Sequence, residues 1–252
     1  MSHSKLPMRR FRAVGITAIV PLVIAGLVAA VSSPQAAAAA PAAIPPPTAG
    51  GWQLNGSSVL NTTASPPNLQ LTPNTIWQAG SAFWPTAVPG VGVTASFDLS
   101  IGSSNSTSGA EGLTFTLADA SVTQPTALGH NGGGIGFAGI TGLAVVFDTW
   151  KLSNTPSNNF VGIAVTTPSQ PSLNYATTST AIPALRNTVH HVTIATNSTG
   201  IVVTMDGNPV LNYATSLPPQ VLVGFTAATG GATDVHQVQN VAITTGPPER
   251  WP

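Results

Sequence analysis

The sequence predicts an all-β fold, a sandwich of two antiparallel sheets, for the chain beyond residue 50. Short apolar runs rich in branched and aromatic residues alternate there with glycine, proline, asparagine and aspartate, which is the pattern of many short strands joined by turns. No apolar pattern of helical period interrupts them over a useful length. The 252 residues include 25 Gly and 23 Pro, and strands at such regular spacing favour one sandwich over two α/β domains.

Residues 1–40 have the composition of a signal peptide. The apolar stretch Ala13–Val31 is followed by the alanine run 36–40, which offers A-x-A cleavage sites. An uncleaved membrane anchor is the alternative, because 19 apolar residues nearly span a bilayer, but Pro21 and the alanine run favour cleavage. We therefore expect a secreted protein, extracellular or at the cell surface after signal-peptide cleavage. Basic residues precede the apolar stretch: Lys5, Arg9, Arg10 and Arg12.

Composition divides the rest of the chain into three segments. Residues 41–51 predict an extended, structureless spacer rich in proline, alanine and glycine. Residues 52–245 are the predicted domain, and residues 246–252 predict a loose C-terminal tail. The chain has no cysteine, so disulfides and thiolate sites are excluded, and the domain must rely on its core, for which about 200 residues are ample.

Turn signals order the strands within this domain. Asn197–Gly200 separates two apolar runs as a hairpin turn, and Asp206-Gly207-Asn208 turns the chain again. A loop that contains Gly132–Gly134 joins two earlier runs. The predicted strands are Val91–Leu99, Leu113–Leu117, Leu143–Phe147, Val161–Thr166, Val189–Ala195, Ile201–Met205, Val210–Tyr213, Val221–Thr226 and Val238–Ile243.

Two carboxylates mark a candidate functional edge. Glu111 precedes the strand Leu113–Leu117, and Asp148 follows the strand Leu143–Phe147. Antiparallel pairing of these two strands would bring both carboxylates toward one edge of the sheet. We therefore expect the functional site at that edge.

Several motifs occur in a characteristic order along the domain: Ala79-Gly80-Ser81-Ala82-Phe83-Trp84, Ala110-Glu111-Gly112, Gly132-Gly133-Gly134, Val146-Phe147-Asp148-Thr149-Trp150, Thr155-Pro156, Phe160-Val161-Gly162-Ile163 and Val223–Gly230. In this order they resemble the legume-type (L-type) lectin family, over roughly residues 52–244. Each motif alone is weak, and their spacing carries the resemblance. It implies the concanavalin A-like jelly-roll β-sandwich of that family.

The resemblance also implies non-enzymatic carbohydrate binding. In the family, an Asp, a glycine-loop N–H, an Asn and an aromatic ring hold the sugar. A carboxylate accepts hydrogen bonds from hydroxyls, glycine permits close backbone approach, and a ring covers the apolar sugar face. Carried over to this sequence, the ligand-binding residues are Glu111, Gly133, Gly134, Trp150, Gly230, Gly231 and Asp234. Leu152 stands where the family has its Asn, and Asn154 is a further candidate because its amide could contact hydroxyls.

The metal-binding positions of the family are largely replaced. Metal-binding members share a calcium and a transition-metal ion among Glu, Asp, Asn, Asp and His. Only Asp148 remains as a charged ligand, and calcium prefers six to eight oxygens. We therefore expect no calcium, manganese or other cofactor, with Asp148 at most a remnant metal ligand. The other matching positions hold Val146, Leu152, Thr155 and Phe160.

Each candidate also has a structural interpretation. Glu111 is as compatible with a solvated strand-end carboxylate as with sugar contact, and the Ala110–Glu111 peptide bond, cis in the family, is open to either isomer. A tryptophan such as Trp150 is more often core than an exposed stacking platform. Asp148 is best explained as an acceptor of hydrogen bonds from the loop that follows it. The candidate donors are Thr149, Ser153 and Asn154.

Charge and motif content exclude several function classes. Beyond residue 40, three lysine or arginine residues stand against seven carboxylates, a formal net charge of −4, so we expect no nucleic-acid partner. No paired-carboxylate pattern of a glycosidase is present, and we expect no enzyme activity. His190 and His191 are adjacent on one predicted strand and must face opposite sides, so a simple strand does not let them bind one metal.

Two hypotheses of function follow. The first is a secreted carbohydrate-binding, lectin-like protein whose partner is a glycan or glycoconjugate. The alternative is a lectin-fold surface structural or adhesion module that has lost sugar binding and meets protein through its flat back sheet. The same sheet is the predicted surface for homo-oligomer formation.

Overall fold

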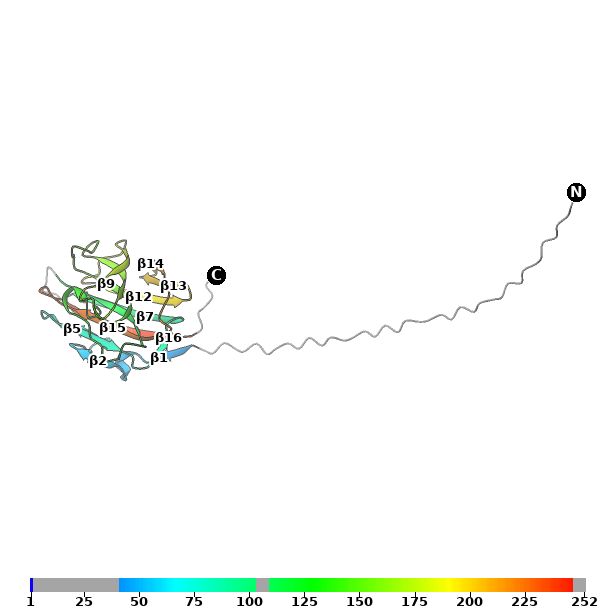
Figure 1. The fold of residues 1–252 in the computed structure, drawn as a ribbon. Coiled ribbons are helices and arrows are strands. Elements are labelled where there is room, and N and C mark those ends of the chain that lie inside the picture. Colours follow the sequence, from blue (N-terminus) through cyan, green and yellow to red (C-terminus); the bar gives the residue numbers. More distant parts are fainter. Residues whose placement is uncertain (2–40, 103–108, 247–252) are drawn as a thin grey trace. The chain divides into compact units, whose positions relative to one another are not determined.

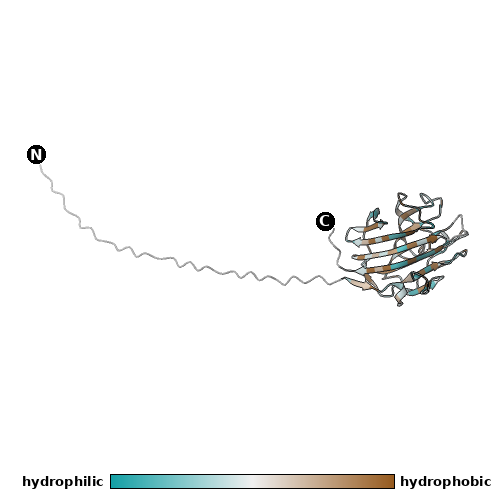
Figure 2. Ribbon diagram, turned by 180° about the vertical axis from the view of Figure 1, so that it is seen from behind, coloured by the Kyte–Doolittle hydropathy of each residue, from teal (hydrophilic) through white to brown (hydrophobic). Residues whose placement is uncertain are grey.

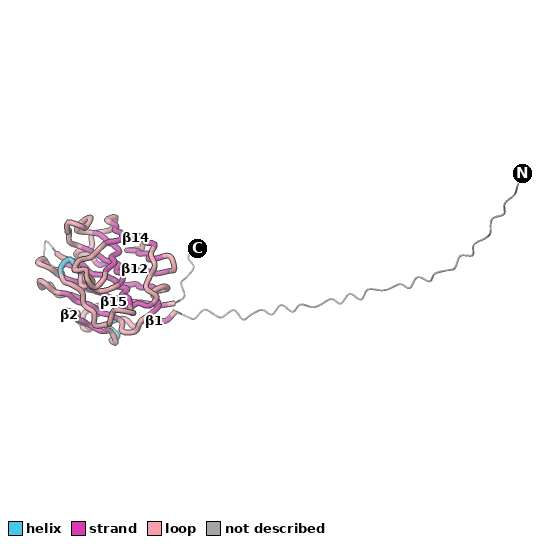
Figure 3. The backbone as a smooth tube through the Cα atoms, in the orientation of Figure 1, coloured by secondary structure: helices cyan, strands magenta, loops and turns pink. Residues whose placement is uncertain are grey.

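The computed structural model describes residues 1, 41–102 and 109–246. From residue 41 onward these residues belong to one compact unit, and most of their regular structure is β-strand (Figures 1 and 3). The predicted signal peptide, apart from Met1, and the predicted tail beyond Gly246 lie outside the described residues. Within the described ranges, no helix is long and apolar enough to cross a bilayer.

Two eight-stranded antiparallel sheets confirm the predicted sandwich. The back sheet has the order β14 (Asn208–Ala214), β13 (Gly200–Met205), β12 (Val189–Asn197), β7 (Val93–Gly102), β16 (Val235–Thr245), β4 (Asn68–Thr72) and β3 (Val59–Asn61), with β1 (Ala42–Ile44) beside β16. The front sheet has the order β11 (Tyr175–Ser179), β10 (Phe160–Thr166), β9 (Gly142–Asp148), β8 (Gly112–Asp119), β15 (Gln220–Ala228), β5 (Ala79–Phe83) and β2 (Gln53–Gly56), with β6 (Val88–Pro89) beside β15.

The main core lies between the sheets and follows from strict alternation along the back strands. In β7 every second residue from Val93 to Ile101 is buried, and the residues between are exposed or half-buried. Hydrophobic and hydrophilic residues alternate along strands of the sandwich in Figure 2. Successive strand residues point to opposite faces, so this alternation places one apolar face on the front sheet. Phe97 of β7 packs on Phe225 of the front sheet, with ring centroids 5.0 Å apart, an edge-to-face contact that aromatic rings favour.

A second core covers the outer face of the front sheet. The strands β8, β9 and β15 are buried at nearly every residue, which requires apolar cover on both faces. The loop between β8 and β9 supplies this cover through Ile135, Phe137 and Ile140, which pack with Val146 and other front-sheet residues. This loop contains the short 3-10 turn η2 (Gly132–Gly134), so its packing fixes the glycine turn close to the sheet.

The predicted strands and turns agree with the structure, with ends shifted by a few residues. Asn197 pairs with Gly200 in a tight hairpin between β12 and β13. Asp206 and Gly207 form the two-residue turn into β14, because Met205 pairs with Asn208. Both turn residues have positive φ, 50° and 79°, the geometry in which Asp-Gly is favoured between strands.

The prediction of a structureless spacer at residues 41–51 was wrong. Ala42–Ile44 forms β1, which pairs with β16, and Pro47–Ala49 forms the 3-10 turn η1. The Trp52 indole N–H then donates to the Pro45 carbonyl at 2.8 Å. The proline content predicted an extended segment without regular structure. The residues that pair with β16 are not prolines, and Ile44 is buried against the sheet, which is favourable for an apolar side chain.

Candidate functional site

The two predicted carboxylates lie at the same edge of the front sheet. Glu111 directly precedes β8, and Asp148 ends β9, where it is the register partner of Gly112. The Ala110–Glu111 peptide bond is cis. The Glu111 backbone is held on both sides, because its N–H donates to the Ala228 carbonyl at 3.0 Å and its carbonyl accepts from the Thr149 N–H at 2.8 Å. The expected proximity of the two carboxylates is therefore confirmed.

A pocket of about 470 Å³ opens at this edge. Five segments build it: the loop before β5, the segment before β8, the η2 turn, the loop after β15 and the loop that follows Asp148. The pocket combines aromatic rings, one carboxylate and several glycines. Its lining residues are Trp77, Glu111, Gly132, Gly133, Trp150, Leu152, Gly230, Gly231 and Ala232.

A side chain at Gly230 or Gly133 would displace a neighbouring side chain of the pocket. A Cβ on Gly230 would lie 2.4 Å from Glu111 Oε1, and a Cβ on Gly133 would lie 2.6 Å from Leu152 Cδ1. Both distances are far below van der Waals contact. The glycine at 230 therefore allows the Glu111 carboxylate to sit against the loop backbone.

Glu111 is a buried carboxylate with no polar partner among the described residues. The residue is 6% exposed, and no hydrogen bond contributes to the state of its carboxylate. Burial, and secondarily the charge of Asp148, raise the pKa of Glu111 to about 7. Desolvation disfavours the charged form, so this side chain changes protonation near neutrality.

Asp148 is more deeply buried than Glu111, but its carboxylate is hydrogen-bonded. The Tyr175 hydroxyl donates to Oδ2 at 2.7 Å, and the Trp150 backbone N–H donates to Oδ1 at 2.8 Å. Burial outweighs these two hydrogen bonds and raises the pKa of Asp148 to about 7. The prediction that Asp148 accepts from the following loop is confirmed for the Trp150 N–H, which means that Asp148 fixes the backbone that carries the Trp150 ring.

The side-chain donor to Asp148 differs from the predicted ones. It is Tyr175 of β11, 27 residues away in the chain, whereas Thr149 uses its hydroxyl to donate to the Glu111 carbonyl at 3.1 Å. Tyr175 reaches Asp148 because β11 and β9 both pair with β10. No local sequence signal predicts such a contact.

These side chains do not fit the calcium and transition-metal pair of the family. Each Asp148 oxygen already accepts a hydrogen bond, and the positions of two further family ligands hold Val146 and Phe160, which are buried apolar residues. Calcium requires several oxygen ligands. Within the described ranges, no three His, Cys, Asp or Glu residues are grouped so that they could hold a metal ion.

Five of the eight predicted ligand-binding residues line the pocket: Glu111, Gly133, Trp150, Gly230 and Gly231. Trp150 is half-buried and contributes to the lining, so it is not simply a core residue.

Three predicted residues lie outside the lining, each for a physical reason. The Gly134 N–H donates to the Asn131 carbonyl inside the η2 turn. Asn154 is exposed in the loop beyond Trp150. Asp234 is fully buried and accepts from Arg186 Nε at 2.7 Å and Nη2 at 2.9 Å, so its carboxylate is not directed to a ligand. We therefore remove these three from the candidate site.

Trp77 is the largest of the four lining residues that were not predicted; the others are Gly132, Leu152 and Ala232. Trp77 is 59% exposed, its backbone N–H donates to the Gly230 carbonyl at 3.0 Å, and its ring lies over Gly132 and Gly231. The available signal was its position two residues before the motif that starts at Ala79.

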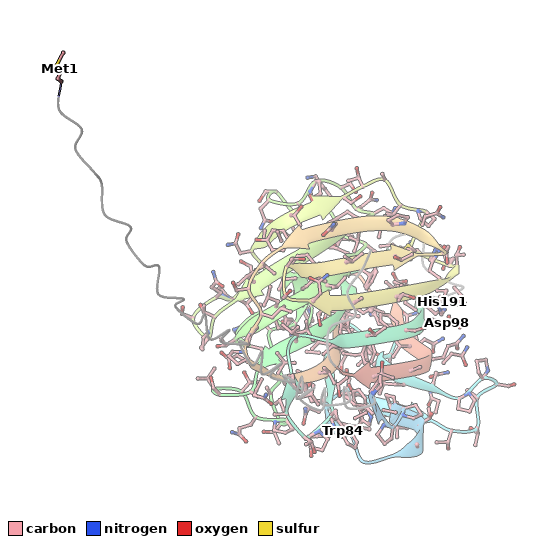
Figure 4. All side chains as sticks on the ribbon, turned by 90° about the vertical axis from the view of Figure 1, so that its right-hand side faces the viewer. Met1, Trp84, Asp98 and His191 are labelled. Carbon is pink, nitrogen blue, oxygen red and sulfur yellow. The ribbon has the colours of Figure 1, made fainter. Side chains whose placement is uncertain are left out.

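A separate polar cluster lies on the outer face of the back sheet (Figure 4). His191 Nδ1 lies 2.7 Å from Asp98 Oδ1, and His191 Nε2 lies 3.2 Å from Ser96 Oγ. The order Ser, His, Asp is that of a hydrolytic triad, but β7 lies between β12 and β16, so its backbone N–H groups serve the sheet rather than an oxyanion. His190 is buried on the other face, as predicted from the alternation.

The arrangement is that of a lectin-type sandwich with a pocket at the edge of its front sheet. The sequence matches the legume lectin domain model over residues 53–250. The chain therefore belongs to the legume lectin domain family, which confirms the resemblance inferred from its motifs. No curated protein matches the sequence.

Solved structures with the same fold include two lectins and the VIP36 exoplasmic/lumenal domain. Basic winged bean lectin with Tn-antigen has a TM-score of 0.63 and 24% identity, over 78% of this chain and 93% of that chain. Lectin II from Ulex europaeus has a TM-score of 0.64 and 21% identity, over 79% and 93%. The VIP36 exoplasmic/lumenal domain, in a Ca²⁺/mannose-bound form, has a TM-score of 0.60 and 14% identity, over 80% and 91%. At these identities the comparisons support the fold.

Proposed function

We propose that the protein is a non-enzymatic carbohydrate-binding protein whose binding site is the pocket at the front-sheet edge. The observation that carries this proposal is the combination of a carboxylate, two tryptophan rings and glycine-walled loops around one opening, in a chain of the legume lectin domain family. Solved lectins of this fold carry Tn-antigen and mannose.

Each part of the pocket has a role in sugar binding. Glu111 would accept hydrogen bonds from hydroxyls, which charge on the acceptor strengthens. The Trp77 and Trp150 rings would cover the apolar faces of a sugar. The backbone at Gly133 and Gly231 would lie close to the ligand, because no side chain intervenes.

We further propose that binding does not require a metal ion. In metal-dependent lectins an ion would order the loop after Asp148, whereas here Tyr175 and Asp148 hold that loop by hydrogen bonds. Pre-ordering of a site lowers the entropic cost of binding. Binding is then expected to be insensitive to chelators.

Two further parts of the proposal concern location and partners. The basic and apolar segment at residues 1–40 supports secretion, extracellular or at the cell surface. The partner is a glycan or glycoconjugate, and nucleic acid is not a partner, in keeping with the net negative charge beyond the leader. A homo-oligomer formed through the back sheet stays a prediction.

A glycan array with the purified protein tests the proposal, run once with calcium and manganese and once with a chelator. We expect retention of a defined set of glycans under both conditions, and loss of that retention in Glu111→Ala. Binding that disappears with the chelator would contradict metal independence. The absence of glycan retention under both conditions would contradict sugar binding and support the alternative, a surface structural or adhesion module.

A further inference from the structure

The proposed binding pocket contains one negative charge without a positive partner. Glu111 lines the pocket and is more than nine-tenths buried, and its Oε1 lies against Gly230, another lining residue. A buried carboxylate is normally paired or hydrogen-bonded by the protein. Among the described residues, neither a hydrogen bond nor an ion pair meets this one.

The cations of the described ranges are engaged elsewhere. Arg186 forms an ion pair with Asp234, and the Lys151 amine donates to the Thr155 carbonyl. The nearest charge acting on Glu111 is that of Asp148, which is negative and repels it. The described residues therefore place no lysine or arginine side chain where it would neutralise Glu111.

Aromatic rings stand beside this carboxylate. Trp77 and Trp150 come from different loops and line the same opening as Glu111. Tryptophan is the side chain whose π face attracts cations most strongly. A site that joins an unpaired carboxylate to two tryptophans is chemically complementary to an ammonium group attached to an apolar frame.

On these contacts, and resting on the proposed carbohydrate binding, we propose that the pocket prefers amino sugars with a free, protonated amine over neutral sugars. The ammonium group lies against the Glu111 carboxylate and supplies the hydrogen bonds that the protein does not. The sugar ring packs between the faces of Trp77 and Trp150. A neutral hydroxyl at the same position offers one donor and no charge, and an acetamide offers one donor and a bulkier group.

Two properties of the site agree with this preference. The charge of Asp148 adds to that of Glu111 and so increases the attraction of the site for a cation. Burial strengthens electrostatic interactions because water is partly excluded. A bound ammonium would in turn favour the ionised form of Glu111, whose pKa burial has raised to about 7.

The test compares sugars that differ only in one ring substituent, which is an amine, an acetamide or a hydroxyl. The first series consists of β-1,4-linked tetramers of glucosamine, N-acetylglucosamine and glucose, which carry an amine, an acetamide or a hydroxyl on otherwise equal rings. The second series consists of conjugates of galactosamine, N-acetylgalactosamine and galactose, which have the other configuration at C4. Affinities are measured by calorimetry at pH 7 with the whole protein, for the wild type and for Glu111→Gln. The Gln side chain keeps the shape and removes the charge.

We expect the free-amine ligand of at least one series to bind about 10-fold or more tightly than its neutral counterparts, the ratio of a charge-assisted hydrogen bond to a neutral one. Glu111→Gln should bring this ratio to about 1. Because Glu111 also accepts hydrogen bonds from neutral hydroxyls, the readout is the ratio of affinities and not the affinity for one ligand. The matched control is Asp119→Asn, which removes one charge at the other end of β8, where Asp119 is half-buried and accepts hydrogen bonds from Ser121. This control should leave the ratio unchanged.

Three results would overturn the inference in distinguishable ways. Equal binding of amine and neutral ligands, unaffected by Glu111→Gln, would refute the amino-sugar preference and leave carbohydrate binding intact. If Asp119→Asn lowers the amine-to-neutral affinity ratio as much as Glu111→Gln does, the preference comes from the net charge of the protein and not from Glu111. The absence of binding to both series, and to every glycan of the array, would remove the proposed function itself.

Discussion

Two buried carboxylates near the pocket, Asp234 and Glu111, differ in what surrounds them. Asp234 receives two hydrogen bonds from Arg186, and this ion pair packs against Gly109, two residues before Glu111. Glu111 has a raised pKa and a second negative charge, Asp148, as its electrostatic neighbour. The comparison teaches that the paired carboxylate belongs to the framework of the loops, whereas the unpaired one is available to a ligand.

The largest effect should follow from breaking the framework pair. Arg186→Met leaves Asp234 buried without its cation, which typically costs about 3–5 kcal/mol. We expect the melting temperature to fall by roughly 6–15 °C for a domain of this size, as measured by calorimetry. A loss below about 1 kcal/mol would mean that Asp234 is held by other groups.

Asp148→Asn should change how stability depends on pH. The pKa of Asp148 in the folded protein, about 7, lies above its ordinary value of 3.8, so the folded state binds more protons than the unfolded state between these values. The contribution of Asp148 is therefore fully present below about pH 4 and is lost as pH rises to about 7. From pH 5 to pH 7, the variant should gain roughly 2–3 kcal/mol relative to the wild type.

Urea unfolding of both proteins at several pH values measures this difference. Because Tyr175 and the Trp150 N–H also contact Asp148, the comparison uses the change with pH rather than the absolute stability at one pH. A constant difference across this range would show that the carboxylate is already ionised at pH 5.

Tyr175→Phe isolates the hydrogen bond that holds the loop after β9. The Phe ring keeps the edge contact with Phe160, whose centroid is 5.1 Å away, but Asp148 Oδ2 loses its donor. The expected loss is about 1–3 kcal/mol for an unsatisfied buried acceptor. A weaker affinity for glycans, with unchanged stoichiometry in calorimetry, should accompany this loss because the Trp150 backbone is less firmly held.

The smallest stability effect is expected at the unpaired carboxylate. Glu111→Gln removes no hydrogen bond within the described residues and relieves repulsion with Asp148. At pH 8, the free energy of unfolding should rise by no more than about 1 kcal/mol, because solvent screens the charge that is removed. Thermal unfolding measures this change. A clear destabilisation would show that Glu111, like Asp234, stabilises the loops, and would contradict its assignment as a carboxylate that is available to a ligand.

The strands and the functional edge could be predicted because their signals are local. The alternation in β7, the Asp-Gly turn at residues 206 and 207 and the motif order each depend on neighbours in sequence. The proximity of Glu111 and Asp148 followed from pairing two strands whose ends were recognisable.

The parts that could not be predicted depend on contacts between distant segments. Nothing near Asp234 in the sequence indicates Arg186, 48 residues away, and nothing near Asp148 indicates Tyr175. The edge pairing of Ala42–Ile44 with β16 joins opposite ends of the domain, and a proline-rich composition concealed it. Trp77 was missed because its role depends on the two glycine loops that it covers.

The pairing of β1 with β16 has a consequence for display of the pocket. Ala42 pairs with Thr245, and a Cβ on Gly246 would lie 3.3 Å from Pro41, so both ends of the domain are adjacent at one end of β16. The other end of this strand follows Asp234 and the pocket loop, and its 11 residues span about 35 Å. The pocket and the two ends of the domain, residues 41 and 246, therefore lie at opposite ends of β16.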